Sequence, residues 1–133
     1  MAKSAKIETL LDASAFVAAV LNEPGADMVE DRVDEGAAIS SVNLAESISK
    51  LLYYDYTLEE IQAAVEDMRL RVIPFDKSQS FLISVFQPYI KSHNLSLADR
   101  ACLAVALEGG YTVLTTDRPW KKLPLDVPVQ LIR

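Results

Sequence analysis

Four acidic residues lie where an apolar, strand-like run of the chain ends or the next helix begins: Asp12, Glu46, Asp99 and Asp117. In a parallel α/β sheet all such points share the carboxyl edge of the strands, so we expect the four carboxylates to converge. Like charges in a poorly solvated cleft repel and raise each other's pKa, which favours capture of a cation. Because the predicted ligands are oxygens, without thiolate or histidine, we expect Mg²⁺ or Mn²⁺, ions that commonly act on phosphate esters.

Each acid also has a purely structural interpretation. The pairs Asn43–Glu46 and Ser96–Asp99 have the three-residue spacing of a capping box. Asp12 and Asp117 fit simple helix N-caps. For any one of these residues a cap is the better explanation. Since all four junctions that would share one edge carry an acid, the joint pattern favours a site.

The segments between these acids alternate between strand and helix patterns. Short apolar runs predict strands at 7–11, 38–42, 70–74, 112–116 and 127–132. Helical spacing of apolar residues predicts helices at 14–22, 26–35, 43–54, 58–68, 76–92 and 96–108. Pro88 predicts a kink in the fifth helix. The alternation predicts an α/β three-layer sandwich with a central, mainly parallel sheet of about five strands.

Composition indicates one folded domain spanning 1–133, because 50% of the residues are hydrophobic and 24% are charged. The apolar stretch 13–21 is too short to span a membrane. The single cysteine, Cys102, can form neither an internal disulfide nor a zinc site, and this predicts a cytoplasmic protein.

The net charge of −6 argues against strong sequence-independent binding to nucleic acid, so any such substrate must be held by local cations.

Several polar residues next to the acids are candidates for supporting roles. Ser14, Thr115 and Thr116 could hydrogen-bond the carboxylates or the waters of a bound ion, and Thr116 is preferred over Thr115. Arg100 and Arg118 each directly follow one of the acids, which makes them the best candidates for phosphate contacts. Solvated charge is the favoured interpretation for the lysines at 121–122.

Aromatic side chains could stack on bases, but packing in the core or between helices is the favoured interpretation for Trp120, Tyr53, Tyr54 and Tyr56. The only histidine, His93, excludes a two-histidine acid–base nuclease within one chain. Cys102 lies in an apolar helix and is expected in the core.

Four blocks of sequence around the acids resemble the signature blocks of PIN-domain ribonucleases: LDASA at 11–15, SVNLAE at 41–46, LSLADRACLA at 95–104 and VLTTDRPW at 113–120. More narrowly, the chain is similar to the VapC toxins of bacterial toxin–antitoxin modules. The resemblance spans nearly the whole chain, although 53–94 matches only in general pattern. All four acidic positions of the family pattern are present.

The resemblance implies a Mg²⁺- or Mn²⁺-dependent endoribonuclease that uses metal-activated water to cleave RNA phosphodiesters. In this interpretation Asp12 and Asp99 are the main metal ligands, and Glu46 and Asp117 are further ligands or orient the water. The expected substrate is a loop of tRNA or rRNA.

The resemblance also implies partners. We expect a homodimer and a cognate VapB-like antitoxin whose C-terminal segment covers the active-site groove. Leu51, Leu52 and Tyr53 form a candidate edge for the dimer or antitoxin surface.

Three alternative functions remain open from the sequence. A PIN-fold module without catalytic activity could act only by binding proteins, and a housekeeping RNA-processing nuclease could use the same site. A signalling receiver domain also gathers acids at one sheet edge and accepts a phosphoryl group on one of them. A receiver normally has a lysine at a late strand end, whereas this chain has Arg118 and Pro119 after Asp117, which argues against that alternative.

Overall fold

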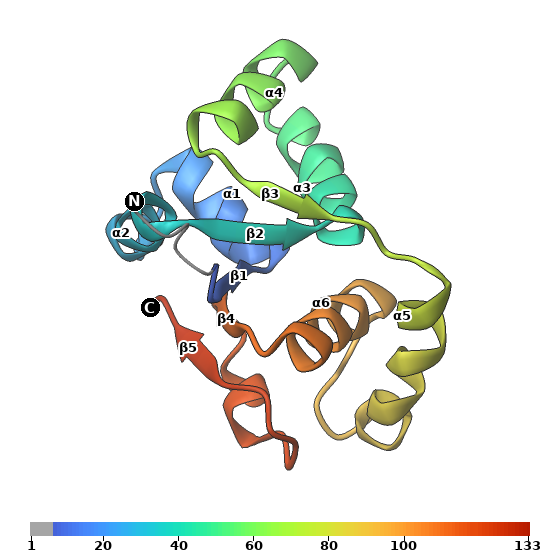
Figure 1. Ribbon diagram of the computed structural model, residues 1–133. Helices are drawn as coiled ribbons and strands as arrows, with labels where there is room; N and C mark the ends of the chain where they lie inside the picture. The colour runs from blue at the N-terminus through green and yellow to red at the C-terminus, as the bar shows by residue number, and fades with distance from the viewer. Residues whose placement is uncertain (1–6) are drawn as a thin grey trace, which may run out of the picture.

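The computed structural model describes residues 7–133, which form one five-stranded sheet in the order β3-β2-β1-β4-β5 (Figure 1). Every neighbouring pair of strands is parallel. The strands are short: β1 (Thr9–Leu11), β2 (Ala37–Ser40), β3 (Arg71–Ile73), β4 (Thr112–Thr115) and β5 (Val129–Leu131). The predicted α/β fold with a parallel sheet of about five strands is therefore confirmed.

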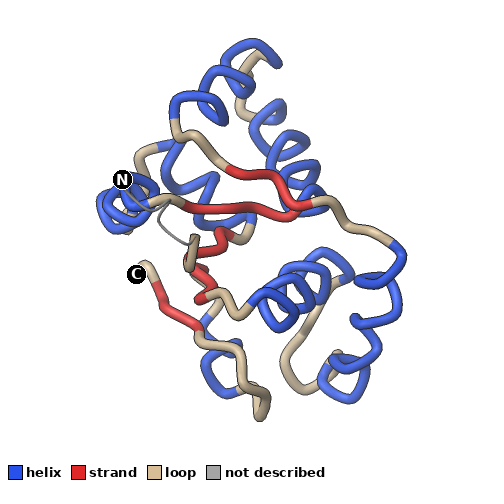
Figure 2. The backbone as a smooth tube through the Cα atoms, viewed as in Figure 1, coloured by secondary structure: helices blue, strands red, loops and turns tan. Residues whose placement is uncertain are grey.

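Helices connect the strands, as Figure 2 shows along the tube. The α-helices are α1 (Ala13–Leu21), α2 (Ala26–Glu35), α3 (Ser41–Tyr53), α4 (Leu58–Asp67), α5 (Lys77–Leu82) and α6 (Leu97–Gly109). Two 3₁₀ helices complete the described elements: η1 (Ile83–Tyr89) and η2 (Arg118–Lys122). Among residues 7–133, no helix combines the length and the apolar character that crossing a membrane requires.

Successive residues of the three central strands pack against opposite helical layers, which produces the three-layer sandwich. One set lies in register across β2, β1 and β4 and packs against the layer of α1 to α4: Ile39, Leu11 and Leu114. The residues just before them pack against the layer that contains α6, η1 and η2: Ala38, Leu10 and Val113. All six are fully buried, as expected for parallel strands covered on both faces.

Helix α6 occupies the centre of the second layer. Its residues 101–106 are all buried, as expected for a helix with almost no polar face. Cys102 is fully buried among them, so its predicted core position is also confirmed. Helix α6 packs against α3, and a hydrogen bond from the Asn43 side chain to the Ala98 carbonyl joins the first turns of the two helices.

The start of α3 differs from the prediction of a strand to residue 42 and a helix from Asn43. The helix begins at Ser41, and Ser40 is its N-cap, with its hydroxyl accepting a hydrogen bond from the Val42 amide at 3.2 Å. Both Ser40 and Asn43 are good capping residues, and tertiary packing decides between them because it buries Asn43 inside the helix. The predicted Asn43–Glu46 capping box is therefore wrong.

The predicted helix at 76–92 is also different, since α5 ends at Leu82 and the chain continues as the tighter η1. Pro88 lies inside η1 and has no amide hydrogen to donate, and its ring crowds the carbonyl group four residues earlier. The 3₁₀ geometry accommodates both effects. The kink expected at Pro88 is thus a change of helix type that begins five residues before it.

Candidate metal centre

The carboxyl ends of β1 and β4 meet where the order of the strands reverses. From β1 the chain adds β2 and β3 on one side of the sheet and then crosses to add β4 and β5 on the other. Parallel sheets bind ligands at such a switch point because the two crossovers leave a crevice there. This structure has a cavity of about 130 Å³ at that place, enough for several water molecules.

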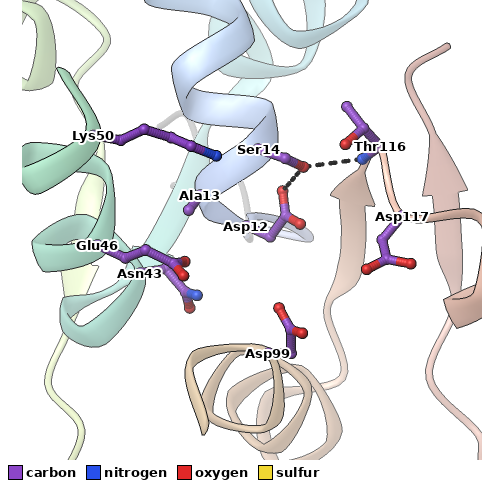
Figure 3. A pocket seen from close by; sticks show the side chains of 9 residues that line it. All are labelled: Asp12, Ala13, Ser14, Asn43, Glu46, Lys50, Asp99, Thr116 and Asp117. Atoms are coloured by element: carbon purple, nitrogen blue, oxygen red, sulfur yellow. Dashed lines mark hydrogen bonds between the residues drawn. The ribbon is translucent and has the colours of Figure 1, made fainter. Parts of the chain in front are cut away.

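All four acids predicted from the sequence line this cavity, which we call the acidic cavity (Figure 3). Its complete lining is Asp12, Ala13, Ser14, Asn43, Glu46, Lys50, Asp99, Thr116 and Asp117. The carboxylates come from four elements or their ends, and Figure 3 shows them pointing into a common space. Arg100 and Arg118 are not among the lining residues.

Asp12 is the most deeply held of the acids. It follows β1 as the N-cap of α1, so its Oδ1 accepts a hydrogen bond from the Ala15 amide at 2.9 Å, and the predicted cap is confirmed. Oδ1 also accepts from the Ser14 hydroxyl, and Oδ2 accepts from the Thr115 hydroxyl, both at 2.6 Å. Burial raises the pKa of Asp12 from 3.8 to about 6, although these three hydrogen bonds oppose the rise, and the charge of Asp99 adds to it.

The hydrogen bonds around Asp12 connect the ends of β1 and β4. Thr115 donates to Asp12 and accepts from the Asp117 amide at 3.0 Å. Thr116 contributes through its main-chain amide, which donates to the Ser14 hydroxyl at 3.0 Å (Figure 3). The hydroxyl that contacts the carboxylate is therefore that of Thr115, although the sequence favoured Thr116, because the register that pairs Leu11 with Leu114 places Thr115 beside Asp12.

We predict that Thr115→Val lowers the free energy of unfolding by about 1–3 kcal/mol, because it removes a donor from a buried carboxylate and the acceptor of a main-chain amide. The substitution nearly preserves the volume of the side chain. Urea denaturation in the presence of a chelator measures the effect. Thr112→Val, at the half-exposed start of the same strand, is the matched control and should change stability by less than about 0.5 kcal/mol. Equal stability of the two variants would contradict this role for Thr115.

Asp99 serves as a cap and lines the cavity at the same time. In the first turn of α6, its Oδ2 accepts from the Ser96 amide at 2.9 Å and its own amide donates to the Ser96 hydroxyl at 3.1 Å, which confirms this capping box. The charge of Asp99 contributes to the raised pKa values of Asp12, Glu46 and Asp117. Asp99 is therefore the one acid whose charge raises the pKa values of all the other three.

One face of α3 forms the opposite wall, with Asn43, Glu46 and Lys50 at positions i, i+3 and i+7. The pKa of Glu46 is raised by partial burial of its carboxyl group and then by Asp99, while Lys50 lowers it. The sequence placed Glu46 in the first turn of its helix, whereas it lies in the second turn because α3 begins earlier.

Asn43 is a lining residue that sequence reasoning missed. It is 1% exposed, and its Nδ2 donates to the Ala98 carbonyl at 3.1 Å, which identifies the other side-chain atom as the oxygen. Among the described residues that oxygen, Oδ1, has no hydrogen-bond partner. A buried unpaired amide oxygen is costly, so it favours a ligand such as the water of a hydrated cation. The helical spacing of Asn43 and Lys50 from Glu46 is the signal that could have identified both.

Asp117 completes the cavity from the end of β4. It is the N-cap residue of η2, but its side chain makes no capping hydrogen bond there, so the predicted side-chain cap is wrong. Burial raises its pKa, and Asp99 raises it further. Its carboxylate is thus available to a ligand in the cavity.

The donors suit a hard divalent cation, since they are carboxylate oxygens together with the buried amide oxygen of Asn43. Within residues 7–133 no three Asp, Glu, His or Cys side chains lie close enough to hold one ion together. Mg²⁺ usually keeps several waters and binds proteins through one or two carboxylates. The cavity fits this arrangement, with one or two acids as direct ligands and the others reached through water.

The pKa values predict an unusual pH dependence of stability for the metal-free protein. The pKa of Asp12 is about 6 in the folded state and 3.8 in its ordinary state, and the pKa values of Glu46 and Asp117 are raised too. The folded protein therefore binds protons more tightly than the unfolded chain. Between about pH 7.5 and pH 5 we expect the free energy of unfolding to increase on acidification, by about 1.4 kcal/mol from Asp12.

Urea denaturation at the two pH values, with a chelator present, measures this dependence. Asp12→Asn is the control, because without this carboxyl group the gain on acidification should shrink. A wild-type protein that loses stability between about pH 7.5 and pH 5 would contradict the prediction.

The other predicted contact residues do not line the acidic cavity. The Arg100 Nε donates to the Ser96 carbonyl at 3.3 Å, and Arg118 lines a separate cavity with Lys122 and His93. Trp120 is 1% exposed, which confirms that it belongs to the core. Tyr56 is half-buried, and its hydroxyl donates to the Val20 carbonyl at 3.5 Å.

The expectation of packing is wrong for Tyr53 and Tyr54, which are 92% and 59% exposed at the end of α3. The proposed edge of Leu51, Leu52 and Tyr53 is wrong for Leu51, which is fully buried. These three residues are consecutive on a helix, so they point in different directions and only part of the set can face solvent.

The all-parallel sheet of five strands, with helices on both faces and an acidic cavity at its switch point, places this chain among the α/β three-layer folds. Residues 9–125 match the family model of the PIN domain, and the chain therefore belongs to the PIN-domain family. A search by sequence among curated proteins finds no match.

Solved structures with the same fold include toxin–antitoxin complexes. The DNA-bound VapBC of Salmonella typhimurium has a TM-score of 0.73 and 19% sequence identity, over 96% of this chain and 100% of that chain. VapBC2 of Rickettsia felis, bound to a promoter DNA fragment, has a TM-score of 0.72 and 20% identity, over 94% and 98%. VapBC-5 of Mycobacterium tuberculosis has a TM-score of 0.62 and 21% identity, over 96% and 99%. The similarity confirms the expected fold.

Proposed function

We propose that this protein is a metal-dependent endoribonuclease and the toxin of a toxin–antitoxin module of the VapC type. The observation that carries the proposal is the acidic cavity, in which four carboxylates from separate parts of a PIN fold face one another and three of them have raised pKa values. Membership of the PIN family and the likeness to VapBC complexes support it.

A bound Mg²⁺ or Mn²⁺ would lower the pKa of a water molecule and neutralise charge on the scissile phosphate. Asp12 and Asp99 would hold this ion. Their carboxylates are already oriented, Asp12 by three hydrogen bonds and Asp99 by its capping box, so little entropy is lost on binding. Glu46 and Asp117 lie on opposite walls, where they can accept hydrogen bonds from the attacking water and orient it.

The reaction is an attack by water on phosphorus in line with the leaving 3′ oxygen, which leaves 5′-phosphate and 3′-hydroxyl ends. The ribose 2′-hydroxyl is not the nucleophile in this reaction. Preference for RNA must therefore come from binding contacts rather than from the chemistry.

The test is incubation of the purified protein with mixed tRNA and rRNA in Mg²⁺, in Mn²⁺ and in a chelator. We expect discrete fragments only when a divalent ion is present, with 5′-phosphate ends in end-mapping. Cleavage that persists in the chelator, or 2′,3′-cyclic phosphate ends, would exclude this mechanism.

We further propose the partners that accompany this function: a VapB-like antitoxin, a second copy of this chain in a homodimer, and a tRNA or rRNA as substrate in the cytoplasm. Structures similar to this chain include toxin–antitoxin complexes, which supports the first of these. Co-purification with the product of a small adjacent gene, and abolition of cleavage by that product, would test the antitoxin proposal.

A PIN module without catalytic activity is the second candidate function. The observation in its favour is that no three potential ligands in residues 7–133 are grouped closely enough for one ion. Titration calorimetry with Mn²⁺ distinguishes the two candidates, because the silent module would release or absorb no heat of binding at the acidic cavity, whereas the nuclease would bind the ion.

A further inference from the structure

A second cavity, of about 160 Å³, shares a wall with the acidic cavity. Ser14, Lys50 and Thr116 line both cavities. Ser14 is held between Asp12, to which it donates, and the Thr116 amide, from which it accepts, so this wall is braced by hydrogen bonds. We call the second space the Lys50 cavity. A ligand that extends out of the acidic cavity over this wall enters it.

The chemistry of the Lys50 cavity differs from that of its neighbour. It carries two cations, Lys50 and Arg133, one acid, Glu23, and the aromatic ring of Tyr54, which is 59% exposed. Aromatic rings and cations together are the means by which proteins bind single-stranded nucleic acid, since bases stack on the rings and phosphates pair with the cations. In a chain of net charge −6, two cations beside the acidic cavity provide a local site for a polyanion.

Lys50 lies on the boundary between the two cavities. It is one helical turn after Glu46 on α3, and Figure 3 shows its side chain extending toward the start of α1 near Ser14. A phosphate that crosses from one cavity to the other would pass this ammonium group.

Two contacts hold the Arg133 guanidinium group in place without neutralising its charge. Its Nη1 lies 3.5 Å from the Glu23 carboxylate and donates to the Pro24 carbonyl at 3.0 Å. Both recorded contacts use the same nitrogen, and the two charged side chains are 39% and 37% exposed, so the ion pair is weak. The remaining donors of the guanidinium fork can bind a phosphate.

We propose that the Lys50 cavity binds the nucleotide next to the scissile phosphate of a single-stranded RNA. Lys50 contacts the phosphate at the boundary, Tyr54 stacks on the base, and Arg133 contacts the following phosphate. This inference rests on the proposed nuclease function and adds the subsite that positions its substrate.

The experiment measures binding of a fluorescein-labelled, mixed-sequence single-stranded RNA by anisotropy, in Asp99→Asn protein so that the RNA stays intact. In that background Lys50→Gln and Tyr54→Ala should each weaken binding by about 5-fold or more. Lys50→Gln and Arg133→Gln should each reduce the slope of log Kd against log salt by about 0.7, the value for one lost phosphate contact on a single strand.

Exposed residues outside both cavities provide the matched controls. Tyr53→Ala removes the neighbouring, 92% exposed tyrosine, and Lys77→Gln removes an exposed lysine at the start of α5, outside both cavities. Both variants should bind the RNA with an affinity within about 2-fold of that of the parent protein. Their salt slopes should differ from the parent's by less than about 0.2.

Two results would overturn the proposal: no salt-dependent binding of the RNA by the parent protein, or equal affinities and slopes in the cavity variants and the controls. If Lys50→Gln retains metal-dependent cleavage with an unchanged KM, the subsite proposal is rejected and the nuclease proposal is not. Absence of any metal-dependent cleavage by the wild-type protein would reject the nuclease function itself.

Discussion

Asp99→Asn is expected to reduce metal-dependent RNA cleavage by about 10²–10⁴-fold, which corresponds to the several kcal/mol that a metal centre contributes to a transition state. The physical reason is that Asp99 would hold the ion in the proposed function, and that its charge adds to the burial that raises the pKa of the other three acids. An asparagine keeps the shape of the side chain but removes that charge.

The fold should survive this substitution. The amide oxygen of an asparagine can still accept the hydrogen bond that Oδ2 now accepts from the Ser96 amide, so the capping box of α6 remains. Initial cleavage rates, together with far-ultraviolet circular dichroism, measure the two expectations. Asp31→Asn, an exposed aspartate on α2, is the matched control and should cleave like the wild type. Cleavage by Asp99→Asn at the wild-type rate would refute the assigned role.

Asp12→Asn is expected to make the metal-free protein more stable and to abolish its response to metal. At neutral pH the buried charge of Asp12 costs on the order of 3 kcal/mol, because the pKa is raised to about 6. The hydrogen bonds survive in part, since the Ser14 and Ala15 donors share Oδ1, which the amide oxygen can replace. The new amide group can donate to the Thr115 hydroxyl, which has a second acceptor lone pair.

We therefore expect the free energy of unfolding of the variant, in a chelator at about pH 7.5, to exceed that of the wild type by about 1–3 kcal/mol. Mn²⁺ at about 100 times its Kd should stabilise the wild type by about 2.7 kcal/mol and the variant hardly at all. Urea denaturation with and without Mn²⁺ measures both effects, with Asp31→Asn again as control. A variant that is less stable than wild type in the chelator would contradict the cost assigned to the buried charge, and equal stabilisation by Mn²⁺ would show that Asp12 is not the principal ligand.

These two expectations separate the functional and structural roles of the acids. At Asp12 and Asp99 the same carboxylate caps a helix and lines the cavity, so the alternatives posed by the sequence coexist. A helix N-terminus tolerates an anion through its partial positive charge, which allows an acid to be placed in a partly buried cavity. Capping thus helps the fold to accept the charge that metal binding requires.

Much of the architecture could be predicted from local patterns. Helices α2 and α4 begin at the predicted residues, and the capping box predicted at Ser96 begins α6. These features depend on interactions within one turn of helix or one strand, which a sequence records directly. The positions of the four acids after strand-like runs, combined with the rule for parallel sheets, also predicted one cavity for all of them.

The remaining features depend on how separate elements meet. Sequence alone did not show that Asn43 is buried against α6, that Lys50 faces both cavities, or that Thr115 rather than Thr116 reaches Asp12. Each of these depends on the register of parallel strands and on the contact between α3 and α6, which join residues more than 50 positions apart in the chain. The sequence by itself determined which acids and caps are present and the order of the elements, whereas only tertiary packing decided which face of each helix borders the cavity, because that packing depends on distant partners.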